Sequence, residues 1–415
     1  MMRRFVLIAL APLLLVVSAP VAADTGISLI ASSVEIAFPT RAVFTLAAES
    51  YVDIVDVRLH YRVDKMNYAE VVSEGWASFA RAGSVQATWT WDMRQAGLPP
   101  GAEVEYWWAV KDADGNRLET PSQVMRFDDD RFVWRNLASV TPEGNELTLF
   151  WYQGSDSFAR ELLNACEEGL ARLTVDIGAY PERPIRIYVY ASASDLLGAM
   201  IFPYEWTGGV AFPEFSTIAI GISPTSSIWG KRALVHELTH LVVHQATYGP
   251  YGQLPIWLDE GLAMYNEGEL ESGFRSRLQQ AIQEDDLISV RSLCSEFSAD
   301  TQTAYLSYAE SYSLVEYLLD EYGEEKMLAL LTLLQQGTTY DQALTDVYGF
   351  DIEGLDARWR ATLIPDAVIV AEAGRSLAAS AVVWAVLAAA VVLSGALVLR
   401  KRARPKFPPW VPPGK

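Results

Sequence analysis

The stretch Ala233–Val242 most constrains what this chain can fold into, because it sets the pattern His-Glu-x-x-His in a run of otherwise uncharged residues. On an α-helix, residues four apart lie about one turn above each other, so His236 and His240 project from one face. They can share a metal ion there, and Glu237 lies beside that face, available as a base. Burying these groups without partners would cost free energy, which a metal ion offsets. The pattern predicts a buried helix over residues 227–245 with a metal site on one side.

A third ligand has to come from elsewhere, because a catalytic zinc site uses three protein ligands and keeps one position open for water. A histidine six residues after His240 is excluded, since that position is Ala246. His244 lies one turn beyond His240, and a turn of about 5.4 Å carries it away from the ion. The segment Ile256–Tyr265 holds Glu260, and a second helix, antiparallel to the first, would bring this carboxylate back to the site.

The N-terminal part has the pattern of β-structure. Short alternating segments between residues 27 and 132 are separated by turns such as Leu98–Gly101 and Asp112–Gly115. Short strands at regular spacing are typical of an all-β sandwich of immunoglobulin-like type, although no Cys-Trp-Cys framework accompanies them. We therefore predict a β-sandwich domain over residues 24–135, which either positions the active site or binds a partner of unknown identity.

The following part, residues 136–363, alternates strands with helices and then becomes helical, which is the order of an α+β domain. Strands are expected at 147–152, 185–190, 208–212 and 217–222, with helices at 156–176 and 192–200. After the motif helix, further helices are expected at 256–267, 272–284, 304–322, 328–334, 340–347 and 352–363.

Two apolar runs lie outside these domains. The first predicts a signal peptide over residues 1–23. The second, Leu377–Leu399, has 23 positions and no charged residue, against roughly 20 needed to cross a bilayer. It predicts a single transmembrane helix over residues 376–399, after a stalk at 364–375 and before a basic tail at 400–415. We expect a single-pass protein of the cell membrane, with the catalytic domain outside and the C-terminus in the cytoplasm.

Charge and cysteine content limit the partners and the chemistry. The formal net charge is −20, and such acidity repels nucleic acid and anionic membrane surfaces. The two cysteines, Cys166 and Cys294, both fall in the part expected outside the cell. A disulfide between them and a pair of free buried thiols are both open, because sequence alone does not place two cysteines within bonding distance.

The motif helix and the segment after it resemble the gluzincin metallopeptidases, the clan that includes thermolysin and the zinc aminopeptidases, and most closely the peptidase MA-like group. The resemblance covers residues 147–363, and Trp257-x-x-Glu260-Gly261 is its most specific match after His-Glu-x-x-His. It implies a thermolysin-like zincin catalytic domain that binds Zn²⁺. The zinc ligands that it implies are His236, His240 and Glu260, and the general base is Glu237.

The resemblance also bears on the residues around the ion. Tyr308 looks like the tyrosine with which the aminopeptidase branch stabilises negative charge, although Tyr305 or Tyr312 could face inward instead and plain packing also suits the pattern. Thermolysin-like enzymes place an aspartate four residues after the ligand glutamate to orient a histidine. Here that position is Met264, so the orienting group must lie elsewhere. Asp259 is expected on the helix surface or in support of a ligand.

Taken together, these features imply a membrane-anchored extracellular zinc metallopeptidase acting on peptides or proteins. The stretch Gly208–Phe212 corresponds to a strand whose glutamate holds the substrate's amine in the aminopeptidases, but it has no carboxylate, and Glu214 is out of register. This difference favours an endopeptidase over an aminopeptidase. Two alternatives stay open: a non-catalytic cell-surface binding module on a peptidase fold, and a zinc hydrolase of a non-peptide bond.

Overall fold

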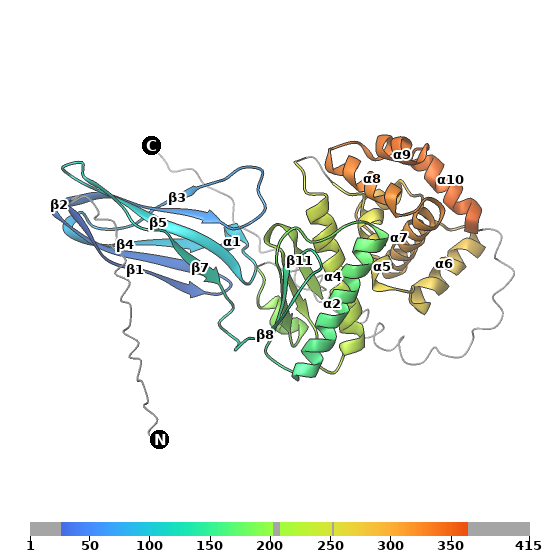
Figure 1. The fold of residues 1–415 in the computed structure, drawn as a ribbon, viewed down its shortest axis with the longest axis horizontal. Coiled ribbons are helices and arrows are strands. Elements are labelled where there is room, and N and C mark those ends of the chain that lie inside the picture. Colours follow the sequence, from blue (N-terminus) through green and yellow to red (C-terminus); the bar gives the residue numbers. More distant parts are fainter. Residues whose placement is uncertain (1–25, 202–207, 251–252, 364–415) are drawn as a thin grey trace, which may run out of the picture.

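Two β-sheets organise the chain (Figure 1). The computed structural model describes residues 26–201, 208–250 and 253–363. The first sheet contains β1 (Ile27–Ala37), β2 (Arg41–Val63), β3 (Ser73–Trp76), β4 (Ala82–Asp92), β5 (Ala102–Asp112), β6 (Arg117–Glu119) and β7 (Gln123–Phe127). The second contains β8 (Arg135–Val140), β9 (Glu146–Trp151), β10 (Ile185–Tyr190), β11 (Gly209–Phe212) and β12 (Thr217–Gly221).

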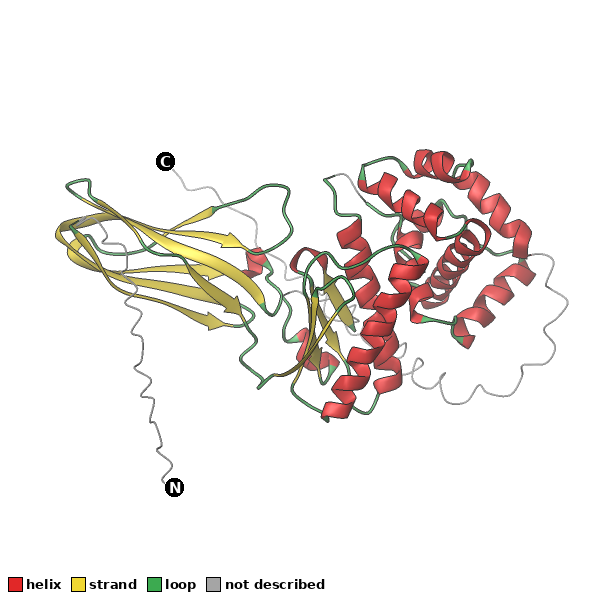
Figure 2. Ribbon diagram, in the orientation of Figure 1, coloured by secondary structure: helices red, strands yellow, loops and turns green. Residues whose placement is uncertain are grey.

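Helices accompany the second sheet, and Figure 2 shows them gathered in the C-terminal part of the molecule. They are α2 (Asp156–Asp176), α3 (Ala193–Leu197), α4 (Ser227–Ala246), α5 (Ile256–Glu267), α6 (Ser272–Glu284), α7 (Thr301–Tyr322), α8 (Glu324–Gln335), α9 (Tyr340–Tyr348) and α10 (Ile352–Leu363), with one-turn elements α1 (Met93–Ala96), η1 (Pro213–Phe215) and η2 (Ser292–Cys294). The helix expected at 304–322 begins earlier, at Thr301, because the side chain of Asp300 accepts a hydrogen bond from Thr303 N at 3.0 Å and caps it.

The first sheet is folded into two layers by its longest strand, β2. The first half of β2 pairs with β1 and β4, and its second half pairs with β3 and β5. Between the layers, the ring centroids of Phe44 and Tyr106 lie 4.9 Å apart, and Trp108 Nε1 donates to Ser32 Oγ at 3.2 Å. The N-terminal part therefore has the two packed layers of a β-sandwich, and the layers share β2 instead of forming separate sheets.

The three central strands of the second sheet, β9, β10 and β12, are buried on both faces. Its strand order is β11-β12-β10-β9-β8, with β9, β10 and β12 parallel and with β8 and β11 antiparallel at the edges. Along β10, Ile187 and Val189 belong to the core formed with the helices, whereas Tyr188 and Tyr190 belong to the core of the first sheet. Burial on both faces explains why β9, β10 and β12 are rich in apolar residues.

The β-sandwich packs directly on the outer face of the second sheet. Tyr190 Oη donates to Asp129 Oδ2 at 3.1 Å, and this fully buried carboxylate also binds Arg131 Nη2 at 2.6 Å. Gly101 approaches the ring of Tyr188 so closely that a Cβ atom at position 101 would lie 2.1 Å from its hydroxyl. The two parts of the chain consequently share one buried aromatic cluster.

The predicted fold class was wrong in one component, the C-terminal transmembrane helix. In the described ranges, no helix combines the length and the apolar character that crossing a membrane requires. The long helices α4 and α7 carry charged side chains along their length, including Arg232 and Glu237 in α4 and Glu310 and Glu316 in α7. The described fold is a β-sandwich followed by an α+β domain. The predicted signal peptide (1–23), stalk (364–375), transmembrane helix (376–399) and tail (400–415) lie outside the described residues.

Both cysteines are free. Cys166 is fully buried in α2, and burial raises the pKa of its thiol. Cys294, in η2, is partly exposed and donates to the carbonyl of Val290 at 3.6 Å. The sequence left open a disulfide or a pair of free thiols, and in the structure Cys166 and Cys294 are free thiols.

Candidate metal centre

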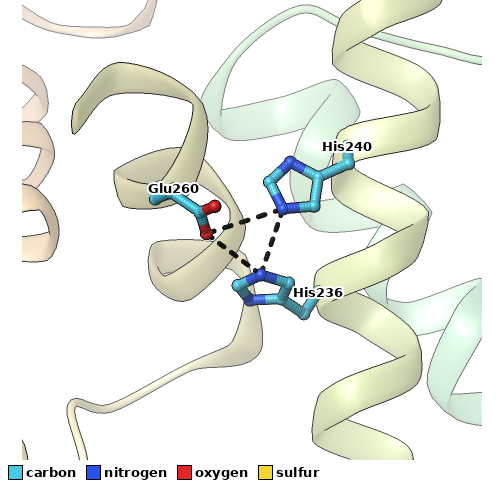
Figure 3. Close-up of side chains that lie close together, drawn as sticks. All are labelled: His236, His240 and Glu260. Carbon is cyan, nitrogen blue, oxygen red and sulfur yellow. Dashed lines mark hydrogen bonds and ion pairs between the residues drawn. The ribbon is translucent and has the colours of Figure 1, made fainter. Parts of the chain in front are cut away.

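Helix α4 places two imidazoles side by side (Figure 3). Leu234, Leu238 and Leu241 are fully buried and fix the helix against the core, which leaves the faces of His236 and His240 turned toward α5. The Nε2 atoms of the two histidines lie 3.1 Å apart. The helical spacing therefore brings the pair together as the sequence predicted.

Helix α5 supplies the carboxylate. It packs tightly on α7, because a Cβ atom at Gly261 would lie only 2.4 Å from the carbonyl oxygen of Ser311. Close packing at this glycine sets the position of the neighbouring Glu260. Its Oε2 lies 3.3 Å from His236 Nε2 and 3.7 Å from His240 Nε2 (Figure 3).

Each histidine is oriented by a second carboxylate of α5. His236 Nδ1 donates to Glu267 Oε1 at 2.7 Å, and His240 Nδ1 donates to Asp259 Oδ1 at 2.9 Å. The other oxygen of Asp259 accepts from His244 Nε2 at 3.0 Å. Asp259 thus supports a candidate ligand, which was one of its two expected places, and His244 is bound to that support.

Glu267 is the functional residue that sequence reasoning missed. It lies seven residues after Glu260, which is two turns of helix, so both side chains share one face of α5. Its second oxygen accepts from Arg232 Nε at 3.2 Å. Met264 stands where thermolysin-like enzymes have an orienting aspartate, so the sequence indicated that this group lies elsewhere. The spacing of two helical turns after Glu260 is the sequence pattern that points to Glu267.

The charges of the site favour a cation at its centre. Burial lowers the pKa of His236, but the contacts with Glu260 and Glu267 outweigh burial and raise the pKa to about 9. The pKa of His240 is likewise raised, because Asp259 and Glu260 outweigh its burial. Burial raises the pKa of Glu260, yet the two imidazoles lower it to about 2. The carboxylate of Glu260 is therefore ionised beside the two histidines at neutral pH.

The donor set fits a metal ion. Because each Nδ1 donates to a carboxylate, each Nε2 faces the same point, and a metal ion that displaces its proton would bind the lone pair there. Glu260 Oε2 faces that point, is buried, and has no hydrogen-bond partner of ordinary geometry in the described part of the chain. Ligands bound at about 2.0–2.1 Å in a tetrahedron lie roughly 3.3 Å apart. The three observed separations, 3.1, 3.3 and 3.7 Å, lie around that value.

Glu237 lies between α4 and the edge strand β11. A Cβ atom at Gly209 would be 2.9 Å from Glu237 Cγ and 3.0 Å from its Oε1, so the strand passes directly over this carboxylate. Burial raises the pKa of Glu237, and the positive charge of the two histidines opposes that shift. A buried carboxylate with a raised pKa beside three metal donors is suited to take up and release a proton.

Of the tyrosines Tyr305, Tyr308 and Tyr312 of α7, Tyr308 is the one whose pKa is raised by the carboxylates of the centre. Its ring packs against Phe297, with centroids 5.1 Å apart. Burial raises the pKa of its hydroxyl, and the negative charges of Glu260 and Glu237 raise it further. Tyr312 instead donates to Glu316 at 3.2 Å, and Tyr305 stacks on Phe274. The catalytic role of Tyr308 stays a prediction.

A protein-family profile matches the C-terminal part of the chain. The sequence profile described as Peptidase MA superfamily matches residues 165–365, a range that contains α4 and α5 with all the residues of the centre. No curated protein matches the chain.

Two solved structures illustrate what the chain is similar to. The crystal structure of Legionella pneumophila aminopeptidase A in complex with aspartic acid is 8% identical, with a TM-score of 0.39, and the similarity covers 81% of this chain. It covers 50% of that protein, so the chain spans half the length of this aminopeptidase. The crystal structure of a carbohydrate-binding module family 56 β-1,3-glucan binding domain is 21% identical with a TM-score of 0.15, over 23% of this chain and 96% of that one.

Proposed function

We propose, from the premise that residues 165–365 match the peptidase MA superfamily, that this protein is a zinc-dependent peptidase. The observation that carries the proposal is the meeting of His236 Nε2, His240 Nε2 and Glu260 Oε2 within 3.1–3.7 Å, with Glu237 beside them. Two imidazoles and one carboxylate are the ligand set of catalytic zinc in thermolysin-like hydrolases.

The side chains of the centre have separate tasks. His236, His240 and Glu260 would hold the ion, while Glu267 and Asp259 keep the imidazole rings in place through their Nδ1 atoms. An ion bound there supplies Lewis acidity, which polarises a carbonyl and lowers the pKa of a water molecule. Glu237 accepts the proton of the attacking water at its carboxylate and passes it to the amine that leaves.

Negative charge grows on the carbonyl oxygen during the attack and requires a donor. Tyr308 is our candidate for this donor. Burial and the negative charges of Glu260 and Glu237 raise the pKa of its hydroxyl, which therefore keeps its proton at neutral pH. A phenol that stays protonated can donate a hydrogen bond to the developing oxyanion.

We further propose that the substrate is an extended peptide cleaved internally. Strand β11 is an edge strand, and its outer edge pairs with no other strand of the described part of the chain. Such an edge offers backbone groups to which a peptide can add as a further strand. The described residues of β11 have no carboxylate to hold a free amine, and the carboxylate of Glu214 just beyond them binds Lys65 Nζ at 2.7 Å.

The test combines metal analysis with an unbiased peptide library. The purified protein should contain one zinc ion per chain and should cut peptides at internal bonds. Glu237→Gln should keep the metal and lose cleavage by about 10²–10⁴-fold, the usual size of a general-base contribution. Glu321→Gln, an exposed change on α7, is the matched control and should cut normally.

Other results would contradict the proposal. Absence of bound metal in both the parent protein and His236→Ala would reject the metal centre. Metal without cleavage of any peptide would reject the peptidase and leave the binding module or a non-peptide substrate. Cleavage confined to N-terminal residues would reject the internal mode of action.

A further inference from the structure

A loop of the β-sandwich reaches the second domain at the end of β11. This segment, the 64–72 loop, joins β2 to β3. Met66 N donates to the carbonyl of Glu214 in η1 at 2.8 Å, and Lys65 Nζ binds the carboxylate of Glu214 at 2.7 Å. Because η1 follows β11 directly, the loop is attached where that strand ends.

The same loop also contacts the chain just after α4. Tyr248 Oη donates to the carbonyl of Met66 at 2.9 Å. The rings of Tyr68 and Tyr248 stack with centroids 4.7 Å apart and planes at 15°. Tyr68 is 60% exposed, so this aromatic pair joins the two domains and presents a surface to solvent.

Two elements lead from the metal centre to this pair. On α4, His240, His244 and the following Tyr248 succeed one another at intervals of four residues, and the side chain of His244 is 42% exposed. With a rise of 1.5 Å per helical residue, Tyr248 is about 12 Å beyond His240. Strand β11 runs from Gly209, beside Glu237, toward η1, which the loop contacts.

An extended peptide that lies along β11 would reach the same place. It advances about 3.3 Å per residue, so about 12 Å corresponds to roughly four residues from the bond held at Glu237. The two stacked rings offer apolar ring faces there. The ammonium of Lys65 is already paired with Glu214, and the hydroxyl of Tyr248 already donates to Met66.

We propose that the Tyr68–Tyr248 ring pair is a subsite for an apolar or aromatic side chain of the substrate, about four residues from the bond that is cleaved. This inference rests on the proposed peptidase function. It gives the β-sandwich a role in selecting substrates, because one ring of the subsite belongs to its 64–72 loop.

The experiment uses one peptide that the intact protein cleaves. Each position within five residues of the cut, on both sides, is changed in turn between serine and phenylalanine. The parent protein should prefer phenylalanine at one position three to five residues from the cut, by about tenfold in kcat/KM, the size expected for one apolar side chain. Tyr68→Ala should abolish that preference, and Tyr68→Phe should keep it.

Two comparisons separate a subsite from a general loss of structure. A shorter peptide that ends before this position should be cut equally well by the parent protein and Tyr68→Ala. Tyr51→Ala, which changes a 94% exposed tyrosine of β2, should retain the preference. A preference that survives Tyr68→Ala, or an equal slowing of short and long peptides, overturns the subsite. Failure of the parent protein to cleave any peptide overturns the peptidase function itself.

Discussion

Glu267 binds the side chain of His236 on one side and that of Arg232 on the other. A carboxylate that accepts from Nδ1 fixes the imidazole ring and makes Nε2 a better metal donor. The neighbouring Glu269 is exposed, and only its backbone carbonyl contacts Arg232. The two glutamates therefore differ in their relation to the centre although they are two residues apart.

We predict that Glu267→Gln weakens zinc binding by about 10–100-fold, the usual effect of losing such a partner. The amide keeps the size of the side chain but removes the negative charge that Nδ1–H contacts. Competition with a chromogenic chelator measures the affinity. Glu269→Gln should bind zinc like the parent protein, and equal affinity in all three proteins would show that Glu267 does not orient the ring.

A second residue, Glu310 of α7, contributes to stability in a pH-dependent way. It is fully buried, Oε1 accepts from Ile288 N at 2.9 Å, and Oε2 has no hydrogen-bond partner among the described residues. Burial raises the pKa of this carboxyl to about 8 from its ordinary 4.5. Between these two values the folded protein binds more protons than the unfolded chain, so the free energy of unfolding falls as pH rises from about 4.5 to about 8.

We therefore predict that Glu310→Gln makes the protein more stable at pH 8 by about 1–3 kcal/mol, because no buried carboxylate has to ionise. At pH 5 the gain should be much smaller. Urea unfolding at the two pH values measures it. Glu321→Gln, an exposed change on the same helix, should leave the pH dependence unaltered, and a gain that is equal at both pH values would contradict the assignment.

At the scale of elements, the contact between β11 and α4 positions the base. A Cβ atom at Gly209 would lie 2.9 Å from Glu237 Cγ, whereas one at Gly208 would meet only Trp229, at an ordinary 3.7 Å. The strand can pass this close to the carboxylate only because residue 209 has no side chain. The two adjacent glycines thus form a natural pair of test positions.

Gly209→Ala should lower kcat/KM by about tenfold to a hundredfold, since a displacement of about 1 Å at a catalytic group has effects of that order. Zinc content should stay the same, because the atoms nearest to the added Cβ belong to Glu237, which is not one of the three candidate ligands. Kinetics and metal analysis on the same samples measure both quantities. Gly208→Ala should behave like the parent protein, and a matching loss in both variants would point to a general disturbance of β11.

At the scale of the whole molecule, the β-sandwich and the second sheet share a core. Tyr188 and Tyr190 of β10 are buried against the sandwich, and Gly101 of the sandwich approaches Tyr188 too closely for any side chain. Its φ of 76° also favours glycine. Gly115 has a similar φ of 87° but nothing within 4 Å of its Cβ position.

We predict that Gly101→Ala destabilises the protein by about 1–3 kcal/mol more than Gly115→Ala, the usual cost of overpacking a core. Both variants share the strain of a positive φ, so the difference isolates the contact with Tyr188. Thermal unfolding followed by circular dichroism, with metal release measured in parallel, checks it. Because the core is shared, Gly101→Ala should lower the temperature of metal release together with the temperature at which the circular-dichroism signal of the β-strands is lost. Release at the parent temperature would show that the two parts unfold independently.

Local patterns predicted much of this protein. The helical period placed His236 and His240 on one face, and α2 and α6 occupy their expected ranges, because the spacing of side chains along a helix depends only on its own geometry. Helix α7 begins three residues before its expected start, because the side chain of Asp300 caps it. The sequence predicted a strand at residues 185–190, where β10 lies, but it did not say what covers the face of Tyr188 and Tyr190.

The sequence by itself determined the chemistry that the centre can offer: two imidazoles one helical turn apart, a carboxylate on the next helix and a glutamate beside them. Only the tertiary structure decided which groups support that chemistry. Glu267 reaches His236 because α5 packs against α4, and the 64–72 loop reaches η1 because the sandwich covers the second sheet. These contacts join residues far apart in the chain, and their distances follow from how elements pack, which no local spacing encodes.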